Sequence, residues 1–181
     1  YSILIDTYVA DDARRAELFG AMETMPCVRE KADWALLYIA NDTADFATRL
    51  VAFACVEGIF FSSSFAAIYY VKTLGLLPGL CQSNEYIARD EGMHTDFAIL
   101  LYVHHIRNKL TQDDVHAIVK TAVEIEERFV CDGLPVGLLG MNQALMCQYV
   151  RFVADRLLLS LGYERVWKTT NPFDFMDNIS T

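Results

Sequence analysis

Three side chains of this sequence have the residue types and the spacing of a metal site. Glu57 is the single acid within the apolar run 51–71, and Glu91 and His94 form an E-x-x-H pair in the next helical segment. An ionised carboxylate buried without a partner costs several kcal/mol or more, so Glu57 needs a cation, a proton or a metal. On a helix, positions i and i+3 share a face, with Cβ atoms roughly 5–6 Å apart. The carboxylate of Glu91 and the imidazole of His94 can therefore hold one ion together.

A Glu on one helix and Glu-x-x-His on its neighbour make half of a carboxylate-bridged dinuclear site in a helical bundle. The E-x-x-H pair alone is weak evidence, because acids and histidines often meet at this spacing on exposed helix faces. Glu57 strengthens the metal hypothesis, because the apolar run gives no other reason for an acid there.

The other histidines and a second acidic group are expected to have plainer roles. The histidines predicted to be structural or solvated are His104, His105 and His116. Glu124, Glu126 and Glu127 are predicted to form a solvated acidic face. The alternative, a second metal-binding face of Glu124 and Glu127, lacks an accompanying histidine.

Helical periodicity and capping residues predict an all-α chain that positions these side chains. Residues 44–73 should form the central helix, with its N-cap in 41–43 and its end at Gly75 and Pro78. Gly58 and the three serines 62–64 are poor interior helix formers and indicate a local distortion such as a π-bulge. The other predicted helices are residues 1–9, 11–25, 27–40, 83–107 capped by Ser83 and Asn84, a helix opening at 111, and 141–161.

Composition places limits on the class of protein. The 181 residues fit a single domain, 1–181, and 54% hydrophobic residues with 12% aromatics exclude a disordered chain. The net charge of −9 argues against nucleic acid and against an anionic membrane as a partner. Five cysteines without a C-x-x-C pair favour reduced thiols and a cytoplasmic location.

The run 51–71 is long enough to span a membrane. Glu57 and the serines 62–64 are poor lipid-facing residues, and the flanks show no strong basic asymmetry. We therefore expect a buried central helix of a bundle, with no membrane partner.

Four stretches carry a resemblance to a known family: VEGIFFSSSFAAI, SNEYIARDEGMH, GMNQALMCQYVRFVADRLL and NPFDFM. In this order they closely resemble the small, radical-generating subunit of class I ribonucleotide reductase, of the eukaryotic and viral type. The resemblance covers the chain end to end. It implies a ferritin-like helical bundle that forms a homodimer and holds two irons, with manganese as the alternative metal. In this family oxygen reacts at the iron pair to oxidise a tyrosine to a stable radical. Electrons then pass between that tyrosine and the large catalytic subunit, which reduces ribonucleotides to the deoxyribonucleotides of DNA replication.

The resemblance also assigns roles to residues of this chain. It makes Glu57, Glu91 and His94 iron ligands and Tyr1 the radical tyrosine. Asp90 resembles the aspartate that hydrogen-bonds an iron-ligating histidine on the electron-transfer route. The apolar pocket that shields the radical is matched by Phe61, Phe65 and Ile87.

The chain also departs from the family pattern. The remaining ligands of the family, an acid and another E-x-x-H, precede the radical tyrosine, and here the sequence starts at that tyrosine. The tryptophan on the electron route and the C-terminal tail that docks on the large subunit are also missing. We therefore expect an incomplete ferritin-like bundle that by itself binds iron weakly and forms no radical. Two rivals remain: another di-iron oxidase or iron-storage protein, and an inactive small-subunit paralogue that acts as an assembly partner.

Overall fold

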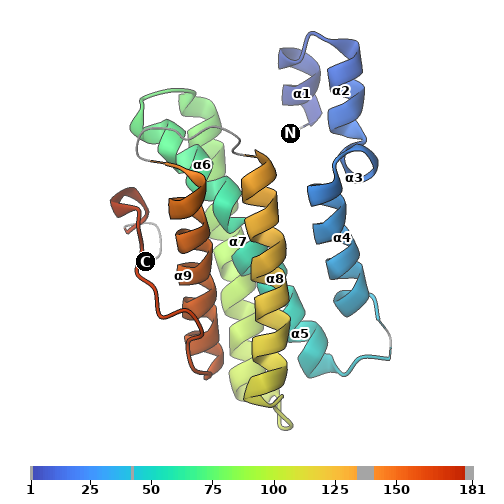
Figure 1. The fold of residues 1–181 in the computed structure, drawn as a ribbon, viewed down its shortest axis with the longest axis vertical. Coiled ribbons are helices and arrows are strands. Elements are labelled where there is room, and N and C mark those ends of the chain that lie inside the picture. Colours follow the sequence, from blue (N-terminus) through green and yellow to red (C-terminus); the bar gives the residue numbers. More distant parts are fainter. Residues whose placement is uncertain (1, 42, 134–140, 178–181) are drawn as a thin grey trace.

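The predicted all-α fold is confirmed in the computed structural model, which describes residues 2–41, 43–133 and 141–177. The helices are α1 (Ser2–Tyr8), α2 (Asp12–Phe19), α3 (Ala21–Thr24), α4 (Pro26–Ile39), α5 (Phe46–Cys55), the π-helix η1 (Val56–Phe60), α6 (Ser62–Thr73), α7 (Pro78–His105), α8 (Gln112–Gly133), α9 (Gln143–Leu161) and the 3₁₀-helix η2 (Asp174–Met176). Helices α5 to α9 form a bundle, α4 packs along one side of it, and α1 and α2 lie beyond the end of α4, beside the bundle (Figure 1).

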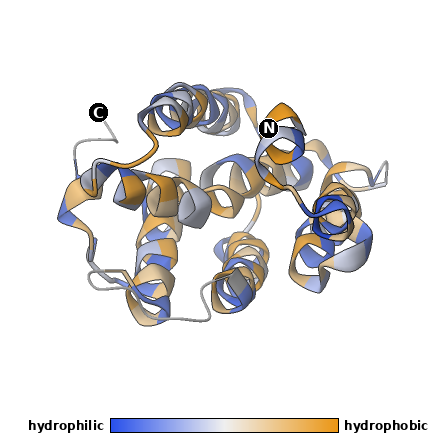
Figure 2. Cartoon of the chain, turned by 90° about the horizontal axis from the view of Figure 1, so that it is seen from above, coloured by the Kyte–Doolittle hydropathy of each residue, from blue (hydrophilic) through white to orange (hydrophobic). Residues whose placement is uncertain are grey.

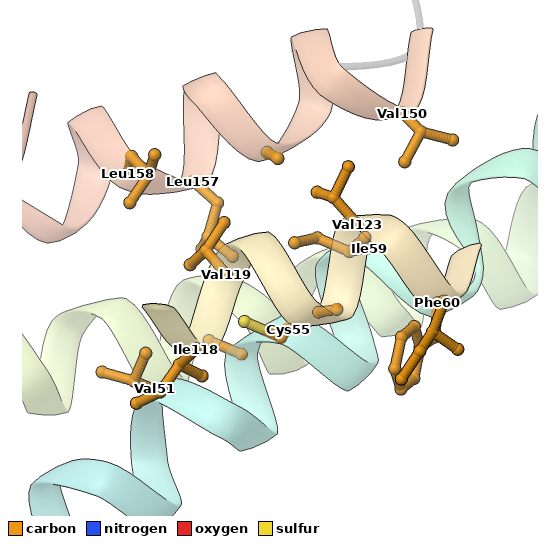
Figure 3. Close-up of a cluster of buried hydrophobic side chains, with 14 of the residues drawn as sticks. Val51, Cys55, Ile59, Phe60, Ile118, Val119, Val123, Val150, Leu157 and Leu158 are labelled. Carbon is orange, nitrogen blue, oxygen red and sulfur yellow. The ribbon is translucent and has the colours of Figure 1, made fainter. Parts of the chain in front are cut away.

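The segment α5–η1–α6 runs through the middle of the bundle. It contacts α4, α7, α8 and α9, and its residues Val51, Ala52, Cys55 and Ile59 are fully buried. The close-up in Figure 3 shows side chains of α8 and α9, including Val119, Val123, Leu157 and Leu158, gathered around Cys55 and Ile59. Hydrophilic and hydrophobic residues alternate around the helices, as expected for amphipathic helices that surround a core (Figure 2).

The distortion predicted near Gly58 is present as the π-helix η1. The predicted central helix is therefore three consecutive helical pieces between Phe46 and Thr73. Its N-cap is Asp45, whose side chain accepts a hydrogen bond from the Thr48 N–H, and not a residue of 41–43 as predicted.

The helix that carries Glu91 and His94 begins earlier than predicted. Pro78 occupies its first turn, so Pro78 opens this helix instead of only ending the previous one. Ser83 and Asn84 lie inside α7, and their predicted role as caps is wrong. The two predicted ends with clear chemistry are confirmed: the Thr111 hydroxyl accepts from the Asp114 N–H ahead of α8, and Gly162 ends α9 in the left-handed conformation.

Residues Phe46–Thr73 are long and apolar enough to cross a membrane by length and composition. Half of the most apolar window is buried inside the fold, and the core helix of a helical bundle passes the same test. The buried part of this segment packs against α4, α7, α8 and α9.

Candidate metal centre

The structure brings the three predicted metal ligands together. Glu57 extends from η1, and Glu91 and His94 extend from one face of α7. The His94 Nδ1 lies 2.7 Å from Glu91 Oε2 and 3.6 Å from Glu57 Oε2. Candidate ligand atoms of all three lie within 4.8 Å of one another. Because metal–ligand bonds to oxygen and nitrogen are about 2.0–2.2 Å, two ligands of one ion lie up to roughly 4 Å apart. Small side-chain movements would therefore let the three hold one ion.

The π-helical turn and a glycine allow this approach. Gly58 follows Glu57 in the part of η1 that faces α7. A Cβ atom at position 58 would lie 3.2 Å from Thr95 Cγ2, which is closer than ordinary van der Waals contact. Gly58 therefore lets η1 approach α7 closely at the level of the three ligands.

Burial changes the acid–base properties of Glu57. Its side chain is only 13% exposed, and this burial, followed by the nearby Glu91 carboxyl, raises the pKa of Glu57 to about 7. The hydrogen bond to Glu91 raises the pKa of the exposed His94 imidazole. A cation bound beside these side chains would remove the cost of ionising Glu57.

The donor set fits a transition metal. Two carboxylates and one imidazole are the mixed ligands found for iron and manganese in helical bundles. Glu57 and Glu91 are 13% and 22% exposed, whereas His94 is 55% exposed, so the cluster is open on the side of His94. The described residues thus provide three candidate ligands, grouped with their ligand atoms close to one another.

A cavity of about 470 Å³ adjoins the cluster. Glu57 and Glu91 border it, and its walls come from α6, α7 and α9. It has an apolar part, which includes Phe65, and a polar part, which includes Arg156. The carboxylates of Glu57 and Glu91 therefore border a cavity whose volume fits a small molecule.

Of the remaining site residues predicted from the resemblance, Phe65 lines this cavity, whereas Phe61, Ile87 and Asp90 do not. Phe65 lines the cavity and stacks on Phe61, with ring centroids 5.9 Å apart. Ile87 is half-buried on α7. Asp90 is exposed, and the cation near it is Arg89, 3.7 Å away. Tyr1 lies outside the described residues, so its role stays a prediction.

The prediction of a solvated acidic face on α8 is wrong for Glu126. Its side chain is completely buried, because it lies on the same helix face as the buried Ala122. There Lys31 Nζ lies 2.6 Å from Glu126 Oε2, and the Ser63 hydroxyl donates to Oε1. Helical spacing from Val115, Val119 and Ala122 could have placed Glu126 in the core.

Of the other two acids, Glu124 fits the predicted solvated face and the half-buried Glu127 does not, whereas the three histidines are exposed or bonded as predicted. Glu124 is exposed, and Glu127 forms an ion pair with Arg151 at 2.6 Å. His104 and His105 are exposed at the end of α7, and His116 Nε2 lies 2.8 Å from the Glu164 carbonyl oxygen.

Comparison with known proteins gives consistent matches. The model of the family "Ribonucleotide reductase, small chain" matches residues 1–172. The chain is 59% identical over 180 residues to the ribonucleoside-diphosphate reductase small chain of Trypanosoma brucei brucei, covering 99% of this chain and 53% of that protein. It is 58% identical to ribonucleoside-diphosphate reductase subunit M2 of Danio rerio, over 99% of this chain and 46% of that protein. The solved Rnr4 homodimer of the ribonucleotide reductase of Saccharomyces cerevisiae matches with a TM-score of 0.86 and 38% identity, over 97% of this chain and 55% of that one. The chain spans about half the length of these relatives.

Proposed function

Because this chain belongs to the ribonucleotide reductase small-chain family, we propose that it is part of the radical-generating subunit of ribonucleoside-diphosphate reductase. The observation that carries the proposal is the convergence of Glu57 with Glu91 and His94 across two packed helices. Family membership alone would also fit a small chain that has lost its metal. The intact donor set argues for one that binds metal.

In this proposal Glu57, Glu91 and His94 hold metal from one side of a two-iron site, with manganese as the alternative. The metal pair supplies the one-electron oxidation of a tyrosine in reaction with oxygen. Glu57 is held as a partly protonated carboxyl until metal binds, since burial raises its pKa to about 7. Glu57 would release that proton on binding the metal.

Tyr1 is the proposed site of the radical. A neutral tyrosyl radical persists only where water and thiols are kept away from the ring. The stacked rings of Phe61 and Phe65, together with the half-buried Ile87, are the proposed apolar shield. Asp90, an exposed residue of α7, is proposed to hydrogen-bond an iron-ligating histidine on the electron-transfer route.

The proposed partners follow from the relatives. The solved relative from Saccharomyces cerevisiae is a homodimer, and we propose that this chain also acts as a homodimer. The second proposed partner is the large catalytic subunit, which uses the radical to reduce ribonucleoside diphosphates. Both partners, and a cytoplasmic location, are proposals for the full-length protein.

The proposal is tested on the full-length protein that carries this sequence. The protein is loaded with Fe(II) without oxygen, oxygen is admitted, and iron per chain and the electron paramagnetic resonance spectrum are recorded. We expect about two irons per chain and a tyrosyl signal that is lost in Tyr1→Phe. Iron without a radical would indicate an oxidase or iron-storage protein instead. Neither iron nor a radical would indicate an inactive assembly partner.

A further inference from the structure

A buried ion pair lies beside the C-terminal end of η1, outside the proposed metal centre. Lys31 of α4 and Glu126 of α8 approach to 2.6 Å, with side chains 16% and 0% exposed. The Lys31 ammonium also lies 3.5 Å from the centre of the Phe129 ring. Two charges thus meet in the core, from two helices that do not carry the proposed ligands.

This ion pair is bonded to both sides of the junction between η1 and α6. The Lys31 ammonium donates a hydrogen bond of 2.8 Å to the carbonyl oxygen of Phe60, the last residue of η1. Ser63, in the first turn of α6, donates its hydroxyl hydrogen to Glu126. A cation at the carbonyl end of a helical segment is favourable, both as a hydrogen-bond donor and through the helix dipole.

The carbonyl before Phe60 is also bonded by a side chain. The buried Ser62 hydroxyl donates to the Ile59 carbonyl oxygen at 2.7 Å. A π-helical turn inserts one residue into the α-helical pattern and disturbs its hydrogen bonds. Side-chain donors on two consecutive carbonyls therefore stabilise this turn where it returns to the α-helix.

The π-helical turn η1 faces α7 and α9 with Glu57 and faces α4 with the Phe60 carbonyl. Glu57 and Gly58 line the cavity together with residues of α7 and α9, whereas the Phe60 carbonyl is bonded to Lys31 of α4. Each residue of an α-helix advances the direction of the side chains by about 100°. Loss of the extra residue in η1 would therefore turn Glu57 by about 100° relative to α6.

Stability alone is a poor explanation for this ion pair. The cost of taking two charges out of water often exceeds their attraction, and apolar side chains of similar size are often as stable. The two charged side chains instead fix the backbone at the end of η1, through the hydrogen bonds to the Phe60 carbonyl and from the Ser63 hydroxyl. We propose that Lys31 and Glu126 are positioning residues for Glu57. With the Ser63 hydroxyl they hold the end of η1, so that the Glu57 carboxylate faces the other two proposed ligands. This inference rests on the proposed metal role of Glu57.

The test separates positioning from stability with two variants of the full-length protein. Lys31→Met leaves Glu126 buried without its cation and should lower the melting temperature. Lys31→Met/Glu126→Gln removes both charges and keeps an acceptor for Ser63, so its melting temperature should return close to that of the wild type. The probe is Co(II), added without oxygen, whose visible absorption reports the number and arrangement of its ligands.

We expect the double variant to bind Co(II) about 10-fold more weakly, as for the loss of a residue that orients a ligand. Its Co(II) absorption should differ from that of the wild type. Without metal, the backbone amides of residues 59–64 should exchange hydrogen faster, although the melting temperature has recovered. A double variant with the Co(II) affinity, the spectrum and the amide exchange of the wild type would overturn the inference.

Two controls keep the failures distinguishable. Arg128→Met breaks an exposed ion pair, Arg128–Glu30 at 2.7 Å, between the same helices α4 and α8. It should leave Co(II) binding unchanged, and a loss as large as that of the double variant would refute a specific role for the buried pair.

Glu57→Gln should weaken Co(II) binding directly. If it does not, the metal role of Glu57 fails and the positioning inference fails with it. If it does while the double variant binds normally, only the positioning inference fails.

Discussion

The pKa of Glu57 is raised to about 7 because its carboxyl is buried and lies beside Glu91. A carboxyl with a raised pKa in the folded state stabilises the fold below its unfolded pKa of about 4.5. That contribution is lost as the pH rises through 7. At neutral and alkaline pH the metal-free protein is therefore less stable, because Glu57 must ionise in a buried position.

Glu57→Gln should relieve this cost in the absence of metal. At pH 8 we expect the variant to be more stable than the wild type by about 1 kcal/mol, a value reduced for partial solvent screening of the site. This corresponds to a melting temperature about 2–4 °C higher. At pH 4.5 the difference should be much smaller, because Glu57 is then protonated in the folded state and about half protonated in the unfolded state. Thermal melts with a chelator present measure the difference, and equal differences at both pH values would contradict the assignment of the raised pKa.

At the residue scale, sequence reasoning found the proposed ligands but missed the buried ion pair. Glu57 was conspicuous because its neighbours in sequence are apolar. Glu126 has Glu124 and Glu127 as neighbours, and Lys31 follows Arg29 and Glu30, so each was hidden within a charged stretch. Their burial depends on the packing of α4 against α8, which no local pattern contains.

At the scale of elements, the approach of η1 to α7 depends on the missing side chain at position 58. Gly58→Ala places a methyl group 3.2 Å from Thr95 Cγ2. Alanine favours a helix over glycine by about 1 kcal/mol, so the contact and the propensity oppose each other. Because the ligands lie on the same two elements, we expect the contact to separate them and to weaken metal binding about 10-fold even where stability changes little.

A second substitution tests whether the contact is the cause. Thr95→Ser removes Cγ2 and keeps the hydroxyl that donates to the Glu91 carbonyl oxygen at 3.0 Å. Metal affinity should therefore recover in Gly58→Ala/Thr95→Ser, while Thr95→Ser alone should bind as the wild type. Co(II) titrations of the three variants measure this, and a double variant as weak as Gly58→Ala would show that the close contact is not responsible.

The elements themselves were predictable to different degrees. Gly58 and the serines after it revealed the π-helical turn, because they are poor helix formers within a long apolar helix. The start of α7 is hard to place from the sequence, because Ser83 and Asn84 resemble N-caps and Pro78 resembles a helix terminator. Pro78 serves at the first turn of a helix, where no N–H is required, and Asn84 is fully buried instead of capping.

At the scale of the whole molecule, the proposed metal centre is open on one side. His94 is 55% exposed, and large apolar side chains on the same helix, Met93, Phe97 and Leu100, are exposed beside it. Exposed large apolar side chains next to a candidate site are typical of a face that another segment or chain covers. The fold of the described residues therefore brings three candidate ligands together but leaves His94, one of them, exposed to water.

The 181-residue chain expressed alone should therefore bind iron weakly and form no tyrosyl radical. Glu57, Glu91 and His94 supply three ligands, whereas a dinuclear carboxylate site in a helical bundle uses about six. The measurement compares this chain with the full-length protein under the same anaerobic Fe(II) loading and exposure to oxygen. Glu57→Gln in the 181-residue chain is the matched control, because it removes one ligand without changing the length. We expect weak, Glu57-dependent binding in the short chain. Two irons at full occupancy would contradict this prediction, since three side chains would then suffice for the whole centre.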